Sequence, residues 1–517
     1  MSTVRIHFST FLYSDLAIFF SLAFFNQSLY LLYQHAFKYN KFFWLYYLGL
    51  PVLIGLSAVV FTYLQSRNQT LRHPFSLKAF GLRILIIVFL SPILYWRFYQ
   101  LFLIWRPLPA EWLSFIFLYR WKILPIVMIL YFGLLYLVYR LILAALFIQD
   151  GATLKTALLL SWKKTMQPVR HQLLQFFVIP VSILVSPILL KLFFIALSQL
   201  LHNNISAILF LTAYLLLKNG IQLVFLFYLA SIGNNSIKLI QLKFTHLSVL
   251  FSFLICCGCY SVSSYQLLDQ HNDTQALAIS HRGVSADNAL QNSLTALKKT
   301  HAEEQPDFIE MDIQETSDHH LVVMHDENLK KLANIDARID ELSWDELKHL
   351  TLKENGYQES IPLFSDYLKT ANEIQQKLLI ELKVSAKTKN TIVQQLLPLR
   401  SQLEQHQFQS MDLETAEKIK QAFPKQQVGY ILPFDLLGSP RNSLDFIAIE
   451  SRTASNTLIQ ALEQQQKNVY VWPVNSAITA SAFRLYNANG LISDDLSSLN
   501  KKNTSLTNKL VSILLLN

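Results

Sequence analysis

The sequence predicts two parts of different fold class: an all-α transmembrane helical domain over residues 1–269, and an α/β domain, a (β/α)8 TIM barrel, over residues 270–517. Long apolar runs fill the first part, and short β-rich runs alternate with amphipathic helical stretches in the second. The charge balance also changes sign between them. A chain of 517 residues is longer than one ordinary domain, which agrees with this division.

The charged residues separate the two parts clearly. Up to Asp269 there are 20 Lys and Arg but only 4 Asp and Glu, whereas 24 basic and 31 acidic residues follow. In the first part Lys and Arg lie between apolar runs, a pattern typical of membrane topology. No basic patch interleaved with aromatic residues occurs elsewhere, so we do not expect a nucleic-acid partner.

About seven apolar stretches are long enough to cross a bilayer, which takes about 20 residues. We expect spans at Phe11–Leu32, Phe43–Leu64, Leu82–Ile104, Ile123–Phe147, Leu174–Leu197, Ile208–Ile232 and Leu247–Leu267. Arg83 and Arg97 interrupt the third. The first run is long and others follow it, so we expect a span there and not a cleaved signal sequence. Cys256, Cys257 and Cys259 share the last run, which favours neither a disulfide framework nor a zinc site.

The connections between these spans indicate an orientation. Three of them are rich in Lys and Arg: Arg67, Arg72 and Lys78; Lys155, Lys163, Lys164 and Arg170; Lys238 and Lys243. Placing them inside puts the N-terminus inside and everything after Leu267 outside. The connection Arg106–Lys122 is basic too and then falls outside, against the rule. We therefore expect a multi-pass protein of the cell membrane with an extracellular C-terminal domain.

Three basic residues within the spans, Arg140, Lys191 and Lys218, raise the alternative of a transport or lipid-handling role. Their spans offer almost no acidic partners, so snorkelling toward an interface is the simpler interpretation.

In the second part, short apolar runs predict strands at Leu277–Ser280, Phe308–Ile313, Leu321–Met324, Leu378–Leu382, Gln427–Leu432, Phe446–Ile449 and Val469–Val474, with further ones near Phe408–Met411 and Leu491–Ile492. Helices are expected at Ser293–Lys299, Leu413–Ala422 and Ala454–Gln465. This alternation favours a parallel sheet, and about eight such strands favour closure into a barrel. An open doubly wound sheet remains an alternative.

Three carboxylates on these strands suggest a metal site. Glu310 and Asp312 are two residues apart on one strand and so share a face, and Glu381 lies on another strand. Carboxylates gathered on an inward face repel one another unless a cation lies between them. Three carboxylates suit one hard divalent cation, with Ca²⁺ favoured and Mg²⁺ as the alternative.

Five motifs in order resemble those of the glycerophosphodiester phosphodiesterases: "AISHRGVSADNALQNS" (278–293), "FIEMDIQETSDHHLVVMHDENL" (308–329), "LLIELK" (378–383), "VYVWPVN" (469–475) and "GLISDDL" (490–496). The preceding seven-span region is similar in architecture to the membrane domain of some bacterial members. The resemblance implies a (β/α)8 barrel that hydrolyses glycerophosphodiesters, with a small insertion near 327–371 that partly covers the site.

The resemblance also implies roles for single residues. It assigns the metal to Glu310, Asp312 and Glu381, acid–base catalysis to His281 and His325, and phosphate binding to Arg282 and Lys383. Imidazole suits proton transfer because its pKa lies near neutral pH. Trp472 either packs in the core or lines the glycerol end of the pocket. Which histidine acts as acid stays open, as does whether Asp326 orients His325; Asp494 and Asp495 are expected at the rim of the pocket.

One position departs from the family pattern. The usual Glu-Asn-Thr is Gln291-Asn292-Ser293 here, so one carboxylate is lost while three others remain. We expect release of an alcohol and sn-glycerol 3-phosphate from a glycerophosphodiester or a polyglycerolphosphate polymer. Membrane lipids are expected as a further partner. The alternatives are a phospholipase C- or D-like enzyme acting on intact lipids, and a non-catalytic membrane protein that binds phosphodiesters, for which Gln291 is the only support. The oligomeric state stays open.

Overall fold

A computed structural model describes residues 13–38, 45–66, 71–73, 75–166, 179–201, 203–232, 246–269, 275–434, 437–500 and 505–516. The chain forms two compact units. The first consists of residues 1–102 and 119–269, and the second of residues 103–118 and 270–517. The second unit is therefore built from two separate stretches of chain.

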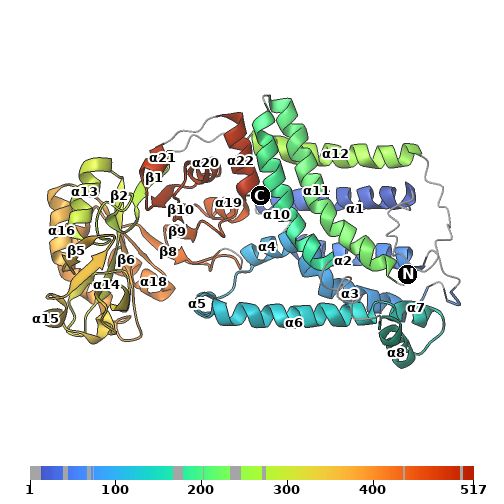
Figure 1. Ribbon diagram of the computed structural model, residues 1–517, viewed down its shortest axis with the longest axis horizontal. Helices are drawn as coiled ribbons and strands as arrows, with labels where there is room; N and C mark the ends of the chain where they lie inside the picture. Colours follow the sequence, from blue (N-terminus) through green and yellow to red (C-terminus); the bar gives the residue numbers. More distant parts are fainter. Residues whose placement is uncertain are drawn as a thin grey trace. The chain divides into compact units, whose positions relative to one another are not determined.

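All the regular elements described in the first unit are helices (Figure 1). Its elements are α1 (Tyr13–Lys38), α2 (Leu45–Ser66), α3 (Leu77–Leu94), α4 (Trp96–Trp105), α6 (Arg120–Leu141), α7 (Ala144–Gln149), α8 (Leu154–Lys164), α10 (Ile179–Leu197), η2 (Ser198–Leu200), α11 (Asn204–Ser231) and α12 (His246–Leu268). The last three residues of α4 belong to the second unit.

Six segments of this unit are long and apolar enough to cross a membrane: Asp15–Tyr33, Tyr47–Ser66, Leu77–Leu94, Arg120–Gln149, Asn204–Ala230 and Val249–Leu268. They confirm the predicted helical membrane domain. The predicted span Leu174–Leu197 begins outside the described residues, and α10 carries a shorter apolar run, Val185–Leu200. That span stays a prediction.

The predicted span Leu82–Ile104 is wrong in its bounds, because the structure divides this stretch into α3 and α4 at Tyr95, which leaves the helical conformation. Pro92 has no N–H to donate to the carbonyl of Val88. The Ser91 hydroxyl donates to that carbonyl instead, at 2.6 Å. Hydrophobicity alone does not reveal such a break, because the residues on both sides of it are apolar.

Arg140 does not snorkel. Its side chain is buried, and it donates to the carbonyl oxygens of Thr165 (2.9 Å) and Trp162 (2.7 Å) at the end of α8. The last carbonyls of a helix lack intrahelical partners and carry its negative dipole end, so they suit a buried guanidinium.

The second unit contains a closed barrel of eight parallel strands, which confirms the predicted fold class and removes the open-sheet alternative. The strands are β1 (Leu277–Ser280), β2 (Phe308–Glu315), β6 (Leu378–Leu382), β7 (Gln407–Ser410), β8 (Val428–Leu432), β9 (Phe446–Glu450), β10 (Asn468–Trp472) and β11 (Gly490–Ser493). Pairing of β1 with both β11 and β2 closes the ring.

The predicted strand Leu321–Met324 forms β3 (Leu321–Val323), which lies outside the ring and pairs antiparallel with the end of β2. The insertion that follows contains α14 (Lys330–Ala333), η4 (Ile339–Glu341), α15 (Trp344–Leu347) and a hairpin of β4 (Thr351–Glu354) and β5 (Tyr357–Ser360). Its apolar residues, among them Leu329, Ile339 and Leu352, form a small core together with Leu290 and Val322.

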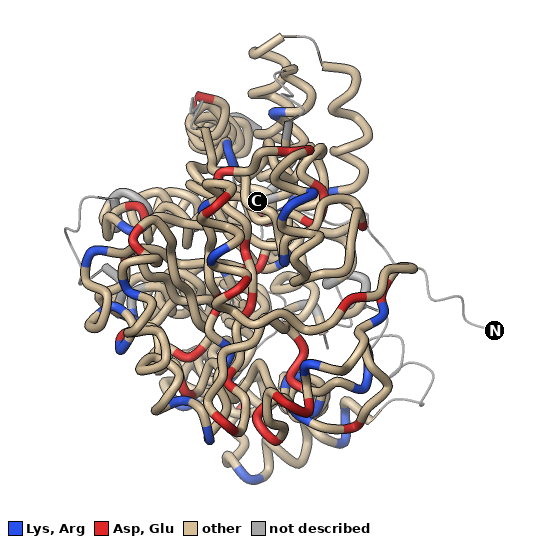
Figure 2. Tube along the Cα trace, turned by 90° about the vertical axis from the view of Figure 1, so that its left-hand side faces the viewer, with Lys and Arg blue, Asp and Glu red and all other residues tan. Residues whose placement is uncertain are grey.

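Helices follow most of the barrel strands. They are α13 (Leu294–Glu304), α16 (Phe364–Glu373), α17 (Ile392–Leu396) with η5 (Leu397–Leu403), α18 (Leu413–Ala422), α19 (Asn456–Gln464), α20 (Ala477–Leu485), and α21 (Ser497–Asn500) with α22 (Leu506–Leu516). Charged residues are spread along the part of the chain that forms the barrel (Figure 2). The described residues between β8 and β9 form no helix.

Inward-facing apolar side chains fill the interior of the barrel away from the carboxyl ends of its strands. Ile279, Ile431 and Ile492 belong to one buried cluster, in which Phe446 and Tyr470 stack with ring centroids 4.4 Å apart. A side chain at Gly429 would overlap the Phe446 ring, so glycine is required there. The packed interior leaves the carboxyl ends of the strands to carry polar chemistry.

Candidate active site

The acidic cluster lies where β2 and β6 run side by side. Asp312 and Glu381 are direct neighbours in the parallel register, and Glu310 is two residues earlier on the same face of β2. All three residues are buried, and one carboxylate oxygen from each lies within 4.8 Å of the others. The structure thus brings the three predicted metal ligands together.

Their electrostatics fit a cation. Burial and the neighbouring Asp312 and Glu381 raise the pKa of Glu310 well above its usual range. Burial would raise the pKa of Asp312 as well, but the charges of Lys383, His325 and Arg282 lower it. Asp312 Oδ1 is buried and accepts no hydrogen bond from a described residue. Three hard oxygen ligands with excess negative charge are what a Ca²⁺ or Mg²⁺ site requires.

Lys383 provides part of the missing positive charge. Its Nζ lies 2.8 Å from Glu381 Oε1 and 3.3 Å from Asp312 Oδ1. Burial alone would lower the pKa of Lys383, but the two carboxylates raise it, so the ammonium stays charged. Lys383 therefore lies at the acidic cluster, at the position expected for a phosphate contact.

Asn292, whose role the sequence did not reveal, fixes Asp312. Its Nδ2 donates to Asp312 Oδ2 (2.8 Å), and its Oδ1 accepts from the Asp312 N–H (3.1 Å). Asn292 has a positive φ of 59°, which Asn tolerates better than most residues. Its place beside Gln291 in the first motif was the only signal in the sequence.

Each of the two predicted catalytic histidines has an aspartate partner on Nδ1. His281 follows β1 and lies 2.6 Å from Asp494 Oδ1, which follows the adjacent strand β11. His325 lies 2.8 Å from Oδ1 of its neighbour Asp326. Partial burial would raise the pKa of Asp494, but the hydrogen bond with His281 lowers it to about 2. An aspartate on Nδ1 leaves Nε2 as the nitrogen available for proton transfer.

Arg282 is held from both its main chain and its side chain. Its backbone N–H donates to Glu310 Oε2 (2.8 Å), and its Nη1 donates to Gln291 Oε1 (2.7 Å). Arg282 adopts a positive φ of 53°, unusual for a non-glycine residue. Its Nε is buried and has no hydrogen-bond partner among the described residues. A buried donor left free next to an acidic cluster fits an anionic ligand.

Gln291, the departure from the family pattern, connects Arg282 to the insertion. Its Nε2 lies 2.7 and 2.8 Å from the two carboxylate oxygens of Glu354 on β4. Lys331 of α14 also approaches Glu354, at 3.6 Å. In the described part of the chain, the Gln291 side chain makes hydrogen bonds to Arg282 and Glu354 and none to the three acidic residues of the cluster. The Gln291 amide accepts a hydrogen bond from the guanidinium of Arg282 and donates hydrogen bonds to the carboxylate of Glu354. An ionised glutamate at this position could only accept, so it could not donate to Glu354.

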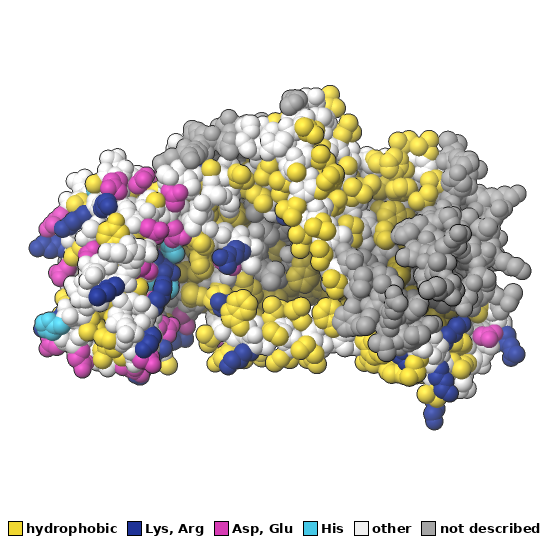
Figure 3. All heavy atoms as spheres, viewed as in Figure 1, with side chains coloured by type: hydrophobic (Ala, Val, Ile, Leu, Met, Phe, Trp, Pro, Cys, Tyr) yellow, Lys and Arg dark blue, Asp and Glu magenta, His cyan; other side chains and the backbone are white. Residues whose placement is uncertain are grey.

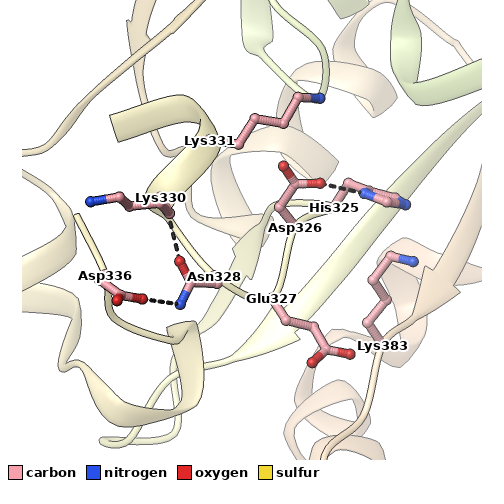
Figure 4. A pocket seen from close by; sticks show the side chains of 8 residues that line it. All are labelled: His325, Asp326, Glu327, Asn328, Lys330, Lys331, Asp336 and Lys383. Carbon is pink, nitrogen blue, oxygen red and sulfur yellow. Dashed lines mark hydrogen bonds and ion pairs between the residues drawn. The ribbon is translucent and has the colours of Figure 1, made fainter. Parts of the chain in front are cut away.

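A cavity of about 550 Å³ opens beside these residues (Figure 4). Its lining residues are His325, Asp326, Glu327, Asn328, Lys330, Lys331, Asp336 and Lys383. Figure 4 shows the insertion on one side, with His325 and Lys383 on the other. The insertion therefore borders the site, as expected. Trp472 packs against the interior cluster, and its Nε1 is buried without a described partner.

The fold and the site define a (β/α)8-barrel enzyme with an acidic, histidine-flanked centre. Residues 281–498 match the model of the "Glycerophosphoryl diester phosphodiesterase family". The barrel of this chain therefore contains a domain similar to this family, and the match covers residues 281–498 alone.

Several known proteins are similar to part of this chain. YhdW of Bacillus subtilis is 25% identical over 229 residues, 42% of this chain and 93% of YhdW. Glycerophosphodiester phosphodiesterase GDPD4 of Arabidopsis thaliana is 26% identical over 185 residues, 33% of this chain and 56% of GDPD4. An Oleispira antarctica phosphodiesterase, solved with the product sn-glycerol-3-phosphate, is 18% identical with a TM-score of 0.39 and covers 43% of this chain and 94% of that one.

The contacts of Gln291 lead to a testable coupling. Gln291→Glu should place a carboxylate against Glu354 and lower kcat/KM for a glycerophosphodiester about tenfold, because contacting residues couple by about 0.5–3 kcal/mol. Adding Glu354→Gln should restore most of the rate by re-forming a mixed amide–carboxylate pair. Steady-state kinetics of the four proteins measures the coupling.

Gln358→Glu is the matched control, because it adds the same charge at an exposed position of the same hairpin. Equal losses in Q291E with and without Glu354→Gln would contradict the coupling.

Proposed function

We propose that this protein hydrolyses glycerophosphodiesters to an alcohol and sn-glycerol 3-phosphate, with a divalent cation, Ca²⁺ in the first instance, held by Glu310, Asp312 and Glu381. The observation that carries the proposal is the convergence of three buried carboxylates. Lys383, which contacts two of them, also lines a cavity of about 550 Å³, and the buried Arg282 Nε has no described partner. The family of the barrel supports the reaction class.

We assign His281 and His325 to proton transfer. Each imidazole has its Nδ1 paired with an aspartate, so Nε2 can take a proton from the attacking hydroxyl or give one to the departing alkoxide. Arg282 and Lys383 would offset negative charge on the phosphoryl oxygens. When bound, a divalent cation supplies Lewis-acid stabilisation of the same charge.

The histidine assignment has a direct test. His281→Ala and His325→Ala should each lower kcat for glycerophosphocholine by about 10²–10⁴-fold, the usual contribution of general acid–base catalysis. Release of glycerol 3-phosphate from the purified full chain measures the loss. His349→Ala, at an exposed position in the insertion, serves as control. Wild-type turnover in either active-site variant would overturn its assignment.

Metal dependence has a separate test. EDTA should abolish turnover and Ca²⁺ should restore it, because the buried carboxylates need a compensating cation. Asp312→Asn should weaken Ca²⁺ binding measured by calorimetry without substrate. Full activity after chelation, with no Ca²⁺ binding, would remove the cation from the proposal.

We also propose that residues 1–269, apart from Leu103–Leu118, form a multi-pass domain of the cell membrane and that the barrel lies outside. Leu103–Leu118 belongs to the same compact unit as the barrel, which supports placing both on one side of the bilayer. The number of spans between Leu118 and Gln270 must then be even. Three of the candidate spans fall there, so the segment containing α10 would be the fourth.

Cysteine labelling tests this topology in a background with Cys256, Cys257 and Cys259 replaced by Ala. Asn203→Cys, after α10, and Ser365→Cys, on α16, should react with an impermeant maleimide in intact cells, whereas Lys155→Cys should react only after permeabilisation. Labelling at Ser365→Cys with protection at Asn203→Cys would exclude α10 as a span.

A further inference from the structure

One helix of the barrel's unit comes from the first half of the sequence, between the candidate membrane spans. The helix α5 (Ala110–Leu118) belongs to the second unit, although about 150 residues separate it from β1. Phe117 of α5 stacks on Phe434 in the connection between β8 and β9, with ring centroids 6.2 Å apart. Figure 1 shows α5 in the neighbourhood of β8, in agreement with this contact. The helix thus lies on the one barrel connection whose described residues form no helix.

Two further contacts fix the same segment to β8 and its connection. The buried hydroxyl of Tyr430, on the outer face of β8, comes near Ser114 of α5, although it makes no hydrogen bond with a described residue. A Cβ on Gly438 would come within 2.5 Å of the Leu103 carbonyl oxygen, so the connection packs closely on the chain that enters α5. This segment is therefore part of the wall of the barrel.

The helix α5 has two apolar faces. Leu113 is fully buried, and Ile116 and Phe117 are half-buried on the side toward the barrel. On the opposite side, Trp112 and Phe115 are 60% and 50% exposed and Leu118 is 69% exposed. These three residues recur at the spacing of one helix face. We call them the outer face of α5.

Water is a poor environment for such a face. The barrel helix α16 presents Ser365, Asp366 and Lys369 outward, as a solvated helix does. Among the described residues of the second unit, the other exposed large hydrophobic residues are scattered: Tyr357, Leu397, Ile478 and Leu515. In Figure 3 charged side chains are spread over the barrel, and hydrophobic ones gather where α5 lies. The exposed Glu111 in the first turn of α5 also lies on this face, beside Phe115, so the face is apolar with one acidic residue at its end. An exposed face that is largely apolar indicates a partner.

The chain that follows α5 indicates which partner. Leu118 leads directly into Tyr119 and α6, the start of the candidate span Arg120–Gln149. Tyr119, Arg120, Trp121 and Lys122 are all exposed at this entrance. Tyr, Trp and basic residues concentrate where spans meet the head groups. We propose that the outer face of α5 lies in the head-group region of the bilayer and holds the β8–β9 side of the barrel against the membrane surface.

Spin labels on the full chain in phosphatidylcholine–phosphatidylglycerol vesicles test this proposal. In the background without native cysteines, labels at Phe115→Cys and Leu118→Cys should collide readily with oxygen and poorly with a water-soluble nickel chelate. The oxygen-to-nickel collision ratio should exceed that of Ser365→Cys on α16 about fivefold or more, because an interfacial apolar face lies roughly 5–10 Å below the surface.

Two results would overturn the proposal. Nickel accessibility equal to that of Ser365→Cys would place the outer face in water, and protection from both reagents would mean that protein, such as a second copy of this chain, covers it. The two labelled positions are independent, so a poorly folded variant at one leaves the other. The outcome does not depend on which diester is hydrolysed.

Discussion

The site depends on holding three carboxylates close together inside a barrel. Buried negative charges that are not compensated are expensive, and Glu310 responds with a raised pKa. The surrounding residues act against this cost: Lys383 contacts Glu381 and Asp312, the Arg282 N–H donates to Glu310, and Asn292 donates to Asp312. The remaining excess of negative charge is what a divalent cation would neutralise.

The histidines obey a second constraint, the control of tautomer. His281 takes its aspartate from the adjacent strand end, and His325 takes its partner from the next residue. The two aspartates come from different positions in the chain, but both pair with Nδ1 of their histidine, so Nε2 is unoccupied by an aspartate in each case. Under the proposed mechanism, the side of the phosphate that each imidazole faces would set the direction of proton transfer.

How much the sequence predicted depends on the range of the interaction. The period of two along a strand placed Glu310 and Asp312 on one face, and alternation of strands and helices predicted the barrel. Local patterns do not distinguish parallel from antiparallel pairing, so β3 was counted with the barrel strands. Glu354 carries no local signal, because its partner Gln291 lies 63 residues away. The helix α5 was hidden in a connection that was read only for its charge.

The position of α5 also determines which fragments of this protein are expected to be stable by themselves. A fragment that begins near residue 270 contains all eight strands and the acidic cluster, but it lacks part of its own outer wall. Tyr430 and Phe434 would then meet solvent where Ser114 and Phe117 cover them in the intact chain. A barrel fragment cut at the apparent domain border would therefore expose an apolar patch that favours aggregation. A fragment that also contained residues 103–118 would keep this patch covered.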